Sequence, residues 1–409
     1  MAGGETTAGG EAKRVLLGVT GGIAAYKAAE LASLLTRRGL EVRVVMTEAA
    51  RRFVGPLTFA ALTGRPVPED MFDPAQEVTI GHIELARWAQ AVVVAPATAN
   101  LIAKAAVGLA DDLLSTVLLA TEAPLLLAPA MNPRMYAHPT VQENLARLES
   151  RGVHLIGPAR GRTACGEEGP GRMAEPAEIA EALMGIMAPR DLEGVTLLVT
   201  AGPTREHLDP VRFISNPSTG RMGIEVARAA ARRGARVILI LGPTHLEPPP
   251  GVETLRVVSA ADMHRAVMER AAQAQAVVAA AAVSDFRPDR CAPQKVKKDG
   301  GEELCRLEAT PDILAELGRD KGGRILVGFA AETEALLANA RAKLEAKNLD
   351  LIVANDVSAP DAGFAVETNR VTFLDRAGGR QELPLMSKAQ VAERLCDRLA
   401  ALLGRNRPA

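Results

Sequence analysis

The fold is decided by VLLGVTGG at residues 15–22 and RRGLEVRVVMT at 37–47, a pattern that returns as TLLVTAGPT at 196–204 and RRGARVILILGPT at 232–244. Each copy reads as a buried strand, a turn, a helix ending in Arg-Arg-Gly, and a second buried strand. Two such starts in one chain predict two separate βαβ-built domains.

Further apolar runs of strand length continue both halves, with helical stretches between them. They lie at residues 91–95, 124–128, 276–282, 325–329 and 350–354. Near-continuous apolar strands that alternate with helices are typical of a parallel sheet covered on both faces. We therefore expect an α/β protein with two doubly wound, Rossmann-like domains, divided near residues 188–193, where Pro189 and Gly194 flank a charged stretch.

Length and composition agree with this expectation and narrow the partners. A chain of 409 residues favours two to three domains, and 48% hydrophobic with 24% charged residues is typical of a soluble globular protein. The net charge of −1 gives no reason to expect nucleic acid or an anionic membrane as a partner. Any ligand that carries phosphate must therefore be bound by local sites.

The location of the protein is predicted from its first residues and its cysteines. Residues 1–13 lack an apolar core, so we expect a disordered arm and no signal peptide. The longest apolar runs are far below the roughly 18–20 residues of a membrane helix. The four cysteines form no C-x-x-C pair, which argues against a structural zinc site and a disulfide framework. These features predict a cytoplasmic protein.

In open α/β sheets, ligands bind beyond the carboxyl ends of the strands, so we expect the functional residues there. In the first half these positions, together with two loops, carry GVTGGIAA at 18–25, GHIEL at 81–85, PATAN at 96–100, PAMNPRM at 129–135 and ACGEEGPGRM at 164–173. Each motif alone is also compatible with a tight turn, a helix cap, a structural histidine or a surface loop. The G-x-G-x-x-G spacing of a dinucleotide site is absent.

The ordered series of these motifs resembles the flavin-dependent cysteine decarboxylase family over residues 14–188. The resemblance implies a flavodoxin-like domain that binds FMN. It makes His82 the active-site base, Asn132 the group that binds the substrate carboxylate, and Cys165 the proton donor on a mobile lid. The implied FMN-binding residues are Gly22, Ile23, Ala24, Ala25, Thr47, Thr98 and Asn100.

The second half also places polar residues after its strands. Asn216 stands in a loop before a predicted helix at 224–233, Asp285 follows a strand, and Lys295 lies on a polar loop. Lys343 and Lys347 are four residues apart and share one helix face. A carboxylate and lysines near strand ends suit a magnesium-bound triphosphate, although a lysine cluster is also common on solvated surfaces. No Walker A loop is present.

This set resembles phosphopantothenate–cysteine ligase over residues 191–404. The resemblance implies that Asn216 handles an acyl-nucleotide intermediate. It favours CTP as the nucleotide, although ATP is left open by the residues themselves, and it implies Mg²⁺ without assigning ligands to it. The implied nucleotide-binding residues are Asp285, Lys295, Pro311, Asp312, Ile313, Leu314, Phe329, Lys343 and Lys347.

Together the two halves resemble the bifunctional enzymes of coenzyme A biosynthesis. Such an enzyme ligates 4′-phosphopantothenate to cysteine and then decarboxylates 4′-phosphopantothenoyl-cysteine to 4′-phosphopantetheine. The resemblance implies small-molecule substrates and a homo-oligomer, with trimeric flavin domains and paired ligase domains that build a shell as large as a dodecamer. Two alternatives are a two-domain NAD(P)-dependent oxidoreductase and a flavin-fold prenyl transferase or flavin-binding module.

Overall fold

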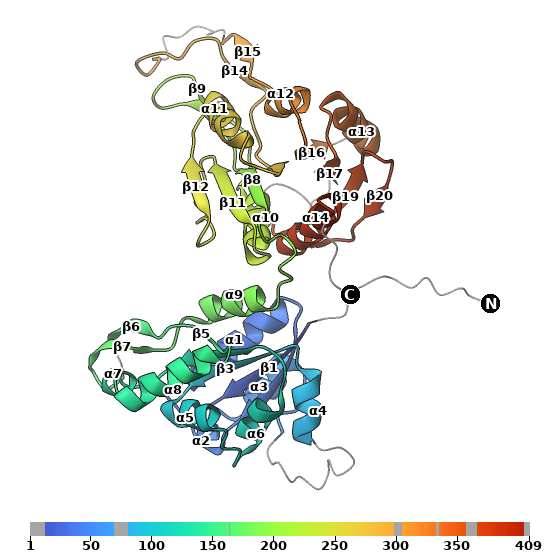
Figure 1. The fold of residues 1–409 in the computed structure, drawn as a ribbon. Coiled ribbons are helices and arrows are strands. Elements are labelled where there is room, and N and C mark those ends of the chain that lie inside the picture. The colour runs from blue at the N-terminus through green and yellow to red at the C-terminus, as the bar shows by residue number, and fades with distance from the viewer. Residues whose placement is uncertain are drawn as a thin grey trace, which may run out of the picture. The chain divides into compact units, whose positions relative to one another are not determined.

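The computed structural model describes residues 13–68, 81–162, 164–297, 305–332, 335–356 and 366–404. Residues 1–12 of the expected N-terminal arm lie outside these ranges. The chain divides into two compact units, Met1–Ala188 and Pro189–Ala409, called here the N-terminal and C-terminal units. Both alternate strands and helices around a central sheet, which confirms the predicted α/β class (Figure 1).

In its described residues, the N-terminal unit is built on a five-stranded parallel sheet of order β2-β1-β3-β4-β5. This is the flavodoxin-like order, in which the topological switch point lies between β1 and β3. The strands of this unit, including a short hairpin β6–β7, are β1 (Arg14–Val19), β2 (Glu41–Met46), β3 (Ala91–Ala97), β4 (Leu125–Pro129), β5 (His154–Leu155), β6 (Ala159–Arg162) and β7 (Glu168–Arg172).

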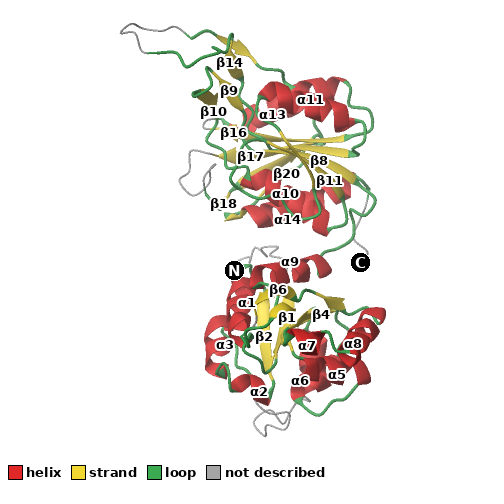
Figure 2. Cartoon of the chain, turned by 90° about the vertical axis from the view of Figure 1, so that its left-hand side faces the viewer, coloured by secondary structure: helices red, strands yellow, loops and turns green. Residues whose placement is uncertain are grey.

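Helices cover both faces of this sheet (Figure 2). Successive residues of β1 point to opposite faces, so Val15 and Leu17 pack with α1, α3 and α9, whereas Leu16 packs with α4, α5, α6 and α8. This two-sided burial explains why the strands read as continuous apolar runs. The helices are α1 (Ala25–Arg37), α2 (Glu48–Arg51), α3 (Pro56–Thr63), α4 (Gly81–Trp88), α5 (Ala99–Val107), α6 (Leu113–Ala120), α7 (Pro133–Tyr136), α8 (Pro139–Ser150) and α9 (Pro176–Ile186).

The C-terminal unit holds an eight-stranded sheet in its described residues, of order β12-β11-β8-β13-β16-β17-β19-β20. Counted from β8, the first six strands follow the dinucleotide-fold order 3-2-1-4-5-6, with the switch point between β8 and β13. Strands β19 and β20 extend this parallel sheet with antiparallel pairs. The sheet strands are β8 (Thr196–Ala201), β11 (Arg236–Leu241), β12 (Glu253–Arg256), β13 (Ala276–Ala279), β16 (Ile325–Glu332), β17 (Leu351–Asp356), β19 (Val371–Asp375) and β20 (Arg380–Glu382).

This sheet is also covered on both sides, by α10 and α14 on one face and by α11, α12 and α13 on the other (Figure 2). Among the described residues of this unit, three two-stranded ribbons, β9–β10, β14–β15 and β18–β21, stand apart from it. The helices and ribbon strands are α10 (Arg221–Arg232), α11 (Ala260–Ala271), α12 (Ile313–Arg319), α13 (Leu336–Ala346), α14 (Lys388–Leu402), β9 (Arg205–His207), β10 (Phe213–Ser215), β14 (Phe286–Pro288), β15 (Leu307–Ala309), β18 (Thr368–Asn369) and β21 (Met386–Ser387).

One predicted strand, at residues 276–282, ends earlier than expected. Regular pairing of β13 stops at Ala279, after which the Ala281 amide donates to the Thr200 hydroxyl (3.2 Å) and the Ala282 amide to the Gly202 carbonyl (2.9 Å). The apolar run therefore leaves the ladder and becomes the wall of a cavity. None of the helices in the described ranges is long and apolar enough to cross a bilayer.

Candidate functional site in each unit

The N-terminal unit contains a cavity of about 1100 Å³ at the carboxyl ends of β1, β2, β3 and β4. Its walls come from the segments that follow these strands and from the β6–β7 hairpin. Eight of the residues predicted for this half line it, namely Gly22, Ile23, Ala24, Thr47, Thr98, Asn100, Asn132 and Cys165.

The floor of this cavity is set by hydrogen bonds between the segments after β1 and β3. The buried hydroxyl of Thr20 donates to the Pro96 carbonyl (2.6 Å) and accepts from the Thr98 amide (3.2 Å). Thr47 caps α2 by accepting from the Ala50 amide (3.3 Å). The predicted threonines thus stand at the starts of α2 and α5, in the wall of the cavity.

Asn132 and Cys165 come from distant parts of the sequence and meet at this cavity. The Asn132 side-chain amide donates to Cys165 Sγ (3.1 Å) and to Glu167 Oε2 (2.8 Å). Its Oδ1 accepts from the Arg134 amide (2.8 Å), which caps α7 and fixes the amide orientation. Glu167 also pairs with the Arg134 guanidinium (3.2 Å). A carboxylate of the protein therefore contacts the amide that was predicted to bind a substrate carboxylate.

The hairpin that carries Cys165 is anchored to the turn after β4. The Met131 amide donates to the Gly171 carbonyl (3.0 Å). A Cβ at position 171 would overlap the Met131 carbonyl oxygen and lie 3.2 Å from the Pro133 nitrogen. Glycine is therefore required for this close approach, and it holds the Cys165 segment over the cavity.

Two lysines at this cavity are paired with carboxylates of the same unit. Lys104 contacts Asp111 (2.6 Å) and Asp112 (2.8 Å), and Lys27 contacts Glu175 (2.8 Å). Burial lowers the pKa of Lys104, but its hydrogen bonds to the two aspartates outweigh this effect and hold that pKa above its ordinary value. The charges of these two lysines are thus offset before any ligand binds.

Two predicted residues do not line the described wall of this cavity. Ala25 is fully buried as the first residue of α1. His82 stands on α4, a helix that packs against α6 and whose Glu84 pairs with Arg43 (3.3 Å). Within one chain the structure therefore brings Asn132 and Cys165 together but leaves His82 apart from them.

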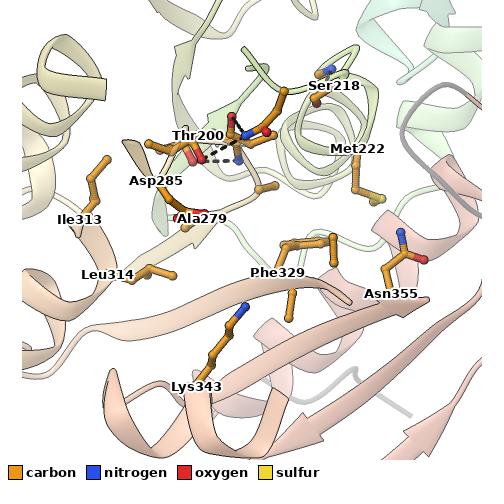
Figure 3. A pocket seen from close by; sticks show the side chains of 18 of the residues that line it. Thr200, Ser218, Met222, Ala279, Asp285, Ile313, Leu314, Phe329, Lys343 and Asn355 are labelled. Carbon is orange, nitrogen blue, oxygen red and sulfur yellow. Dashed lines mark hydrogen bonds between the residues drawn. The ribbon is translucent and has the colours of Figure 1, made fainter. Parts of the chain in front are cut away.

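The C-terminal unit contains a cavity of about 620 Å³ at the switch point between β8 and β13. Figure 3 shows Asp285, Ile313 and Leu314 toward one end of it and Ser218, Met222 and Asn355 toward the other, with Phe329 between them. The predicted residues that line it are Asn216, Asp285, Pro311, Asp312, Ile313, Leu314, Phe329, Lys343 and Lys347.

Asn216 shapes the wall of this cavity. Its side-chain amide donates to the carbonyls of Ala282 (3.1 Å) and Val283 (3.2 Å), in the segment where the run after β13 leaves the sheet. The adjacent Ser215 hydroxyl donates to the Thr204 carbonyl (2.7 Å). These bonds connect the segment before α10 to the segments that follow β8 and β13.

The start of α10 lies unusually close to β8. Gly220, its N-cap, has a positive φ of 79°, and a Cβ at Gly223 would lie 2.5 Å from Ala201 Cβ and 2.8 Å from the Thr200 carbonyl oxygen. Glycines at a helix start that permit close helix–strand packing are a feature of dinucleotide folds. Here they occur without the G-x-G-x-x-G spacing.

At the other end of the cavity, Asp312 and Lys347 form an ion pair (2.9 Å). Asp312 also caps α12 by accepting from the Ala315 amide (3.0 Å). Burial raises the pKa of Asp312, but the Ala315 amide and Lys347 outweigh it and keep that pKa below its ordinary value. Asp312 therefore positions Lys347 and the start of α12 at the cavity.

Lys295 lies apart from the described lining of this cavity. It is exposed in the segment between β14 and β15, whose residues 298–304 fall outside the described ranges. The described residues contain no cluster of three His, Cys, Asp or Glu side chains that could hold a metal ion.

Sequence reasoning missed Lys388, which is 4% exposed and lines the C-terminal cavity as the first residue of α14. The signal present in the sequence was the capping box Ser387-x-x-Gln390, which predicts a helix start. Arg221 and Asn369 line the same cavity and were also missed.

Comparisons with known proteins match both units. The family described as "DNA/pantothenate metabolism flavoprotein C-terminal domain" matches residues 192–403, and the family described as "Flavoprotein" matches residues 5–188. A "Coenzyme A biosynthesis bifunctional protein CoaBC" of Vibrio cholerae is 50% identical over 383 residues, 93% of this chain and 96% of the relative. Its namesake in Bacillus subtilis is 50% identical over 394 residues, 95% of this chain and 97% of the relative. A crystal structure of the C-terminal domain of such a protein is 40% identical, covers 53% of this chain and all of its own, and has a TM-score of 0.46.

Proposed function

Because this chain belongs to the family of coenzyme A biosynthesis bifunctional proteins, we propose that it ligates 4′-phosphopantothenate to cysteine and then decarboxylates the product to 4′-phosphopantetheine. The observation that carries this proposal is the contact between Asn132 and Cys165 at a cavity on the flavodoxin-like sheet. The C-terminal cavity, with Asp285 and two lysines, supplies the ligase site.

FMN fits the N-terminal cavity on the chemistry of its walls. The cavity of about 1100 Å³ lies at the β1/β3 switch point, where flavodoxin-like folds bind this cofactor. The small residues Gly21, Gly22 and Ala24 and the start of α1 leave room for a planar ring and a phosphate. When bound, FMN supplies the two-electron oxidation and the matching reduction that bracket the loss of CO₂.

Two residues of the chain bind the substrate and supply its proton. The Asn132 amide binds the carboxylate that leaves as CO₂, in place of its contact with Glu167. The thiol of Cys165, next to that amide, donates the proton that completes the product. Since both side chains sit at the anchored hairpin, the substrate is held with its carboxylate and reacting carbon at one end of the cavity.

We infer that the N-terminal units act as homo-oligomers, with trimers as the smallest assembly. His82, the proposed base, lies away from the cavity of its own chain, so a second copy is needed to bring it to the reaction. The mouth of the cavity carries Ile23 and Tyr26, which are 62% and 61% exposed and give an apolar surface for such a contact. Pairing of the C-terminal units would extend this assembly.

In the C-terminal cavity, the carboxylate of 4′-phosphopantothenate attacks the α-phosphate of CTP and releases pyrophosphate. The amine of cysteine then displaces CMP and forms the amide. Lys343 and Lys347 offset the charge of the phosphates, and Phe329 lies where a base or an acyl chain can pack. Mg²⁺ would be held by the triphosphate with Asp285 as its protein carboxylate, a donor set that Mg²⁺ accepts.

The proposal is tested with the purified full chain, 4′-phosphopantothenate, cysteine, Mg²⁺ and either CTP or ATP. We expect pyrophosphate and CO₂ in equal amounts, faster with CTP, together with a flavin absorption spectrum of the protein. Pyrophosphate without CO₂ would remove the decarboxylase assignment, and CO₂ release only from added 4′-phosphopantothenoyl-cysteine would remove the ligase assignment. Faster turnover with ATP would overturn the choice of nucleotide.

A further inference from the structure

A carboxylate of the protein lies beside the side chain that binds the substrate carboxylate in the proposed function. The side-chain nitrogen of Asn132 donates to Glu167 Oε2 (2.8 Å) and to Cys165 Sγ (3.1 Å). An asparagine nitrogen carries two N–H groups, so these two contacts use its full donor capacity. A substrate carboxylate can therefore accept from Asn132 only by taking the place of Glu167 or of the thiol.

Contacts around the turn after β4 hold this acid close to the amide. Asn132 is the N-cap of α7, and its Oδ1 accepts from the Arg134 amide (2.8 Å), which orients the side-chain nitrogen. Glu167 directly precedes β7, and β7 is bound to the same turn by the Met131 amide, which donates to the Gly171 carbonyl (3.0 Å). The second carboxylate oxygen of Glu167 pairs with the Arg134 guanidinium (3.2 Å). Glu167 therefore remains next to Asn132 when another group accepts from the amide.

Two carboxylates at one amide repel each other. A substrate carboxylate bound to Asn132 lies within hydrogen-bond reach of the nitrogen that Glu167 also contacts, and like charges this close disfavour each other. Arg134, which pairs with Glu167, and Arg162, on the same hairpin, are both exposed, so solvent weakens the positive charge that they supply. The repulsion lasts only while the substrate carries its carboxylate.

We propose that Glu167 destabilises the bound substrate carboxylate and thereby promotes the loss of CO₂, an inference that rests on the proposed decarboxylase function. In this step the bond between the carboxylate carbon and its neighbouring carbon breaks. The electron pair of that bond stays on the already oxidised substrate, and the anionic carboxylate leaves as neutral CO₂. The repulsion then ends, and Glu167 again accepts from Asn132 while Cys165 donates its proton to the product. An interaction that destabilises the bound substrate more than the transition state raises kcat.

The first test measures binding by calorimetry, on the full chain loaded with FMN. The two ligands lack the thiol and differ only in the carboxylate: 4′-phosphopantothenoyl-serine and its decarboxylated counterpart, 4′-phosphopantothenoyl-ethanolamine. We expect Glu167→Gln, which keeps a hydrogen-bond acceptor but removes the charge, to bind the serine compound about fivefold more tightly, the upper range for partly exposed charge pairs. Its affinity for the ethanolamine compound should not change. Glu168→Gln, at the adjacent exposed carboxylate, is the matched control and should bind both compounds as the wild type does.

The second test measures the chemical step with 4′-phosphopantothenoyl-cysteine. Glu167→Gln should lower both the KM and the rate of CO₂ release at saturation, each by about fivefold, because the repulsion is removed from the bound substrate. Loss of a merely structural contact would instead raise the KM. The ¹³C isotope effect at the carboxylate carbon should increase in the variant wherever another step limits the wild type, since slower cleavage of the carbon–carbon bond then limits turnover.

Several results would overturn the role of Glu167. They are weaker binding of the serine compound by Glu167→Gln, an equal change for both compounds, and an unchanged kcat together with an unchanged isotope effect. The flavin absorption spectrum of each variant shows that its N-terminal unit is folded. Because the analogues bind without turnover, the two proposals fail separately. Glu167-dependent binding without CO₂ release from 4′-phosphopantothenoyl-cysteine would refute the decarboxylase function, and CO₂ release with binding independent of Glu167 would refute the role of this residue alone.

Discussion

The two cavities differ in how they treat their own positive charges. In the N-terminal unit, Lys104 and Lys27 are matched by Asp111, Asp112 and Glu175 before any ligand arrives. In the C-terminal unit, Lys347 and Arg221 are also paired with carboxylates, but the buried Lys388 has its pKa lowered by burial and by the like charge of Arg221. The first arrangement suits a large, mostly neutral ring system with one phosphate. The second suits small substrates that carry several negative charges.

This difference arises although both units begin with the same strand, turn and Arg-Arg-Gly helix pattern. The third strand of the N-terminal unit pairs with β1, whereas in the C-terminal unit the third strand, β12, joins the outer edge of β11. Both orders leave a switch point beside the first strand, so both open a cavity there. The residues that line each cavity then differ in the segments near the C-terminal end of each unit. These segments are the β6–β7 hairpin in one unit and the β18–β21 ribbon with α14 in the other.

The largest effect should follow from removing the thiol of Cys165, in the β6–β7 hairpin of the N-terminal unit. Cys165→Ser replaces a thiol with a hydroxyl, which releases its proton far less readily. We expect formation of 4′-phosphopantetheine to fall by at least about 100-fold, with CO₂ still released and an unsaturated thiol product accumulating. Product analysis by mass spectrometry after single turnovers measures this.

The same variant tests whether the two cavities work independently. Pyrophosphate release with CTP and cysteine should remain at the wild-type rate, because Cys165 and its contact with Asn132 belong to the N-terminal unit. Cys291→Ser, at another exposed cysteine, is the matched control and should leave both reactions intact. Normal 4′-phosphopantetheine formation by Cys165→Ser would remove this thiol from the chemistry.

The next largest effect is on stability, and it distinguishes the unfolding transition of one unit from that of the other. A methyl group at Gly223 would overlap Ala201 and the Thr200 carbonyl, so Gly223→Ala should destabilise the C-terminal unit by about 1–3 kcal/mol. Gly185→Ala in α9 meets nothing within 4 Å and should stabilise the N-terminal unit by up to about 1 kcal/mol. Calorimetric unfolding should show opposite shifts in two separate transitions. A shared shift of both transitions would contradict independent units.

The sequence was sufficient to predict the strands at the centre of each sheet, because burial on both faces makes them continuous apolar runs. The antiparallel strands β19 and β20 were not foreseen, since β19 is only five residues long and β20, Arg-Gln-Glu, contains no apolar residue. Both are recognised as strands only by their pairing at the edge formed by β17. Lys388 illustrates the limit for sites. The capping box at Ser387 predicts the start of a helix. The position of Lys388 at a cavity depends on the pairing of β18 with β21 and on packing against α10, which no local sequence pattern predicts.

The smallest effect concerns the pH dependence that the buried Lys388 adds to the stability of the C-terminal unit. Its pKa of about 8 in the folded chain lies below the ordinary 10.5, because burial and Arg221 both disfavour the cation. In the free protein this group contributes stability that is present above pH 10.5 and is lost as the pH falls through about 8, since the unfolded chain holds the extra proton in that window.

Lys388→Met removes this titrating group, so the rise in the free energy of unfolding between pH 8 and 10.5 should be smaller in the variant than in the wild type. Chemical denaturation of the full chain at several pH values in this range measures the difference. An equal pH dependence in both proteins would show that Lys388 does not titrate there.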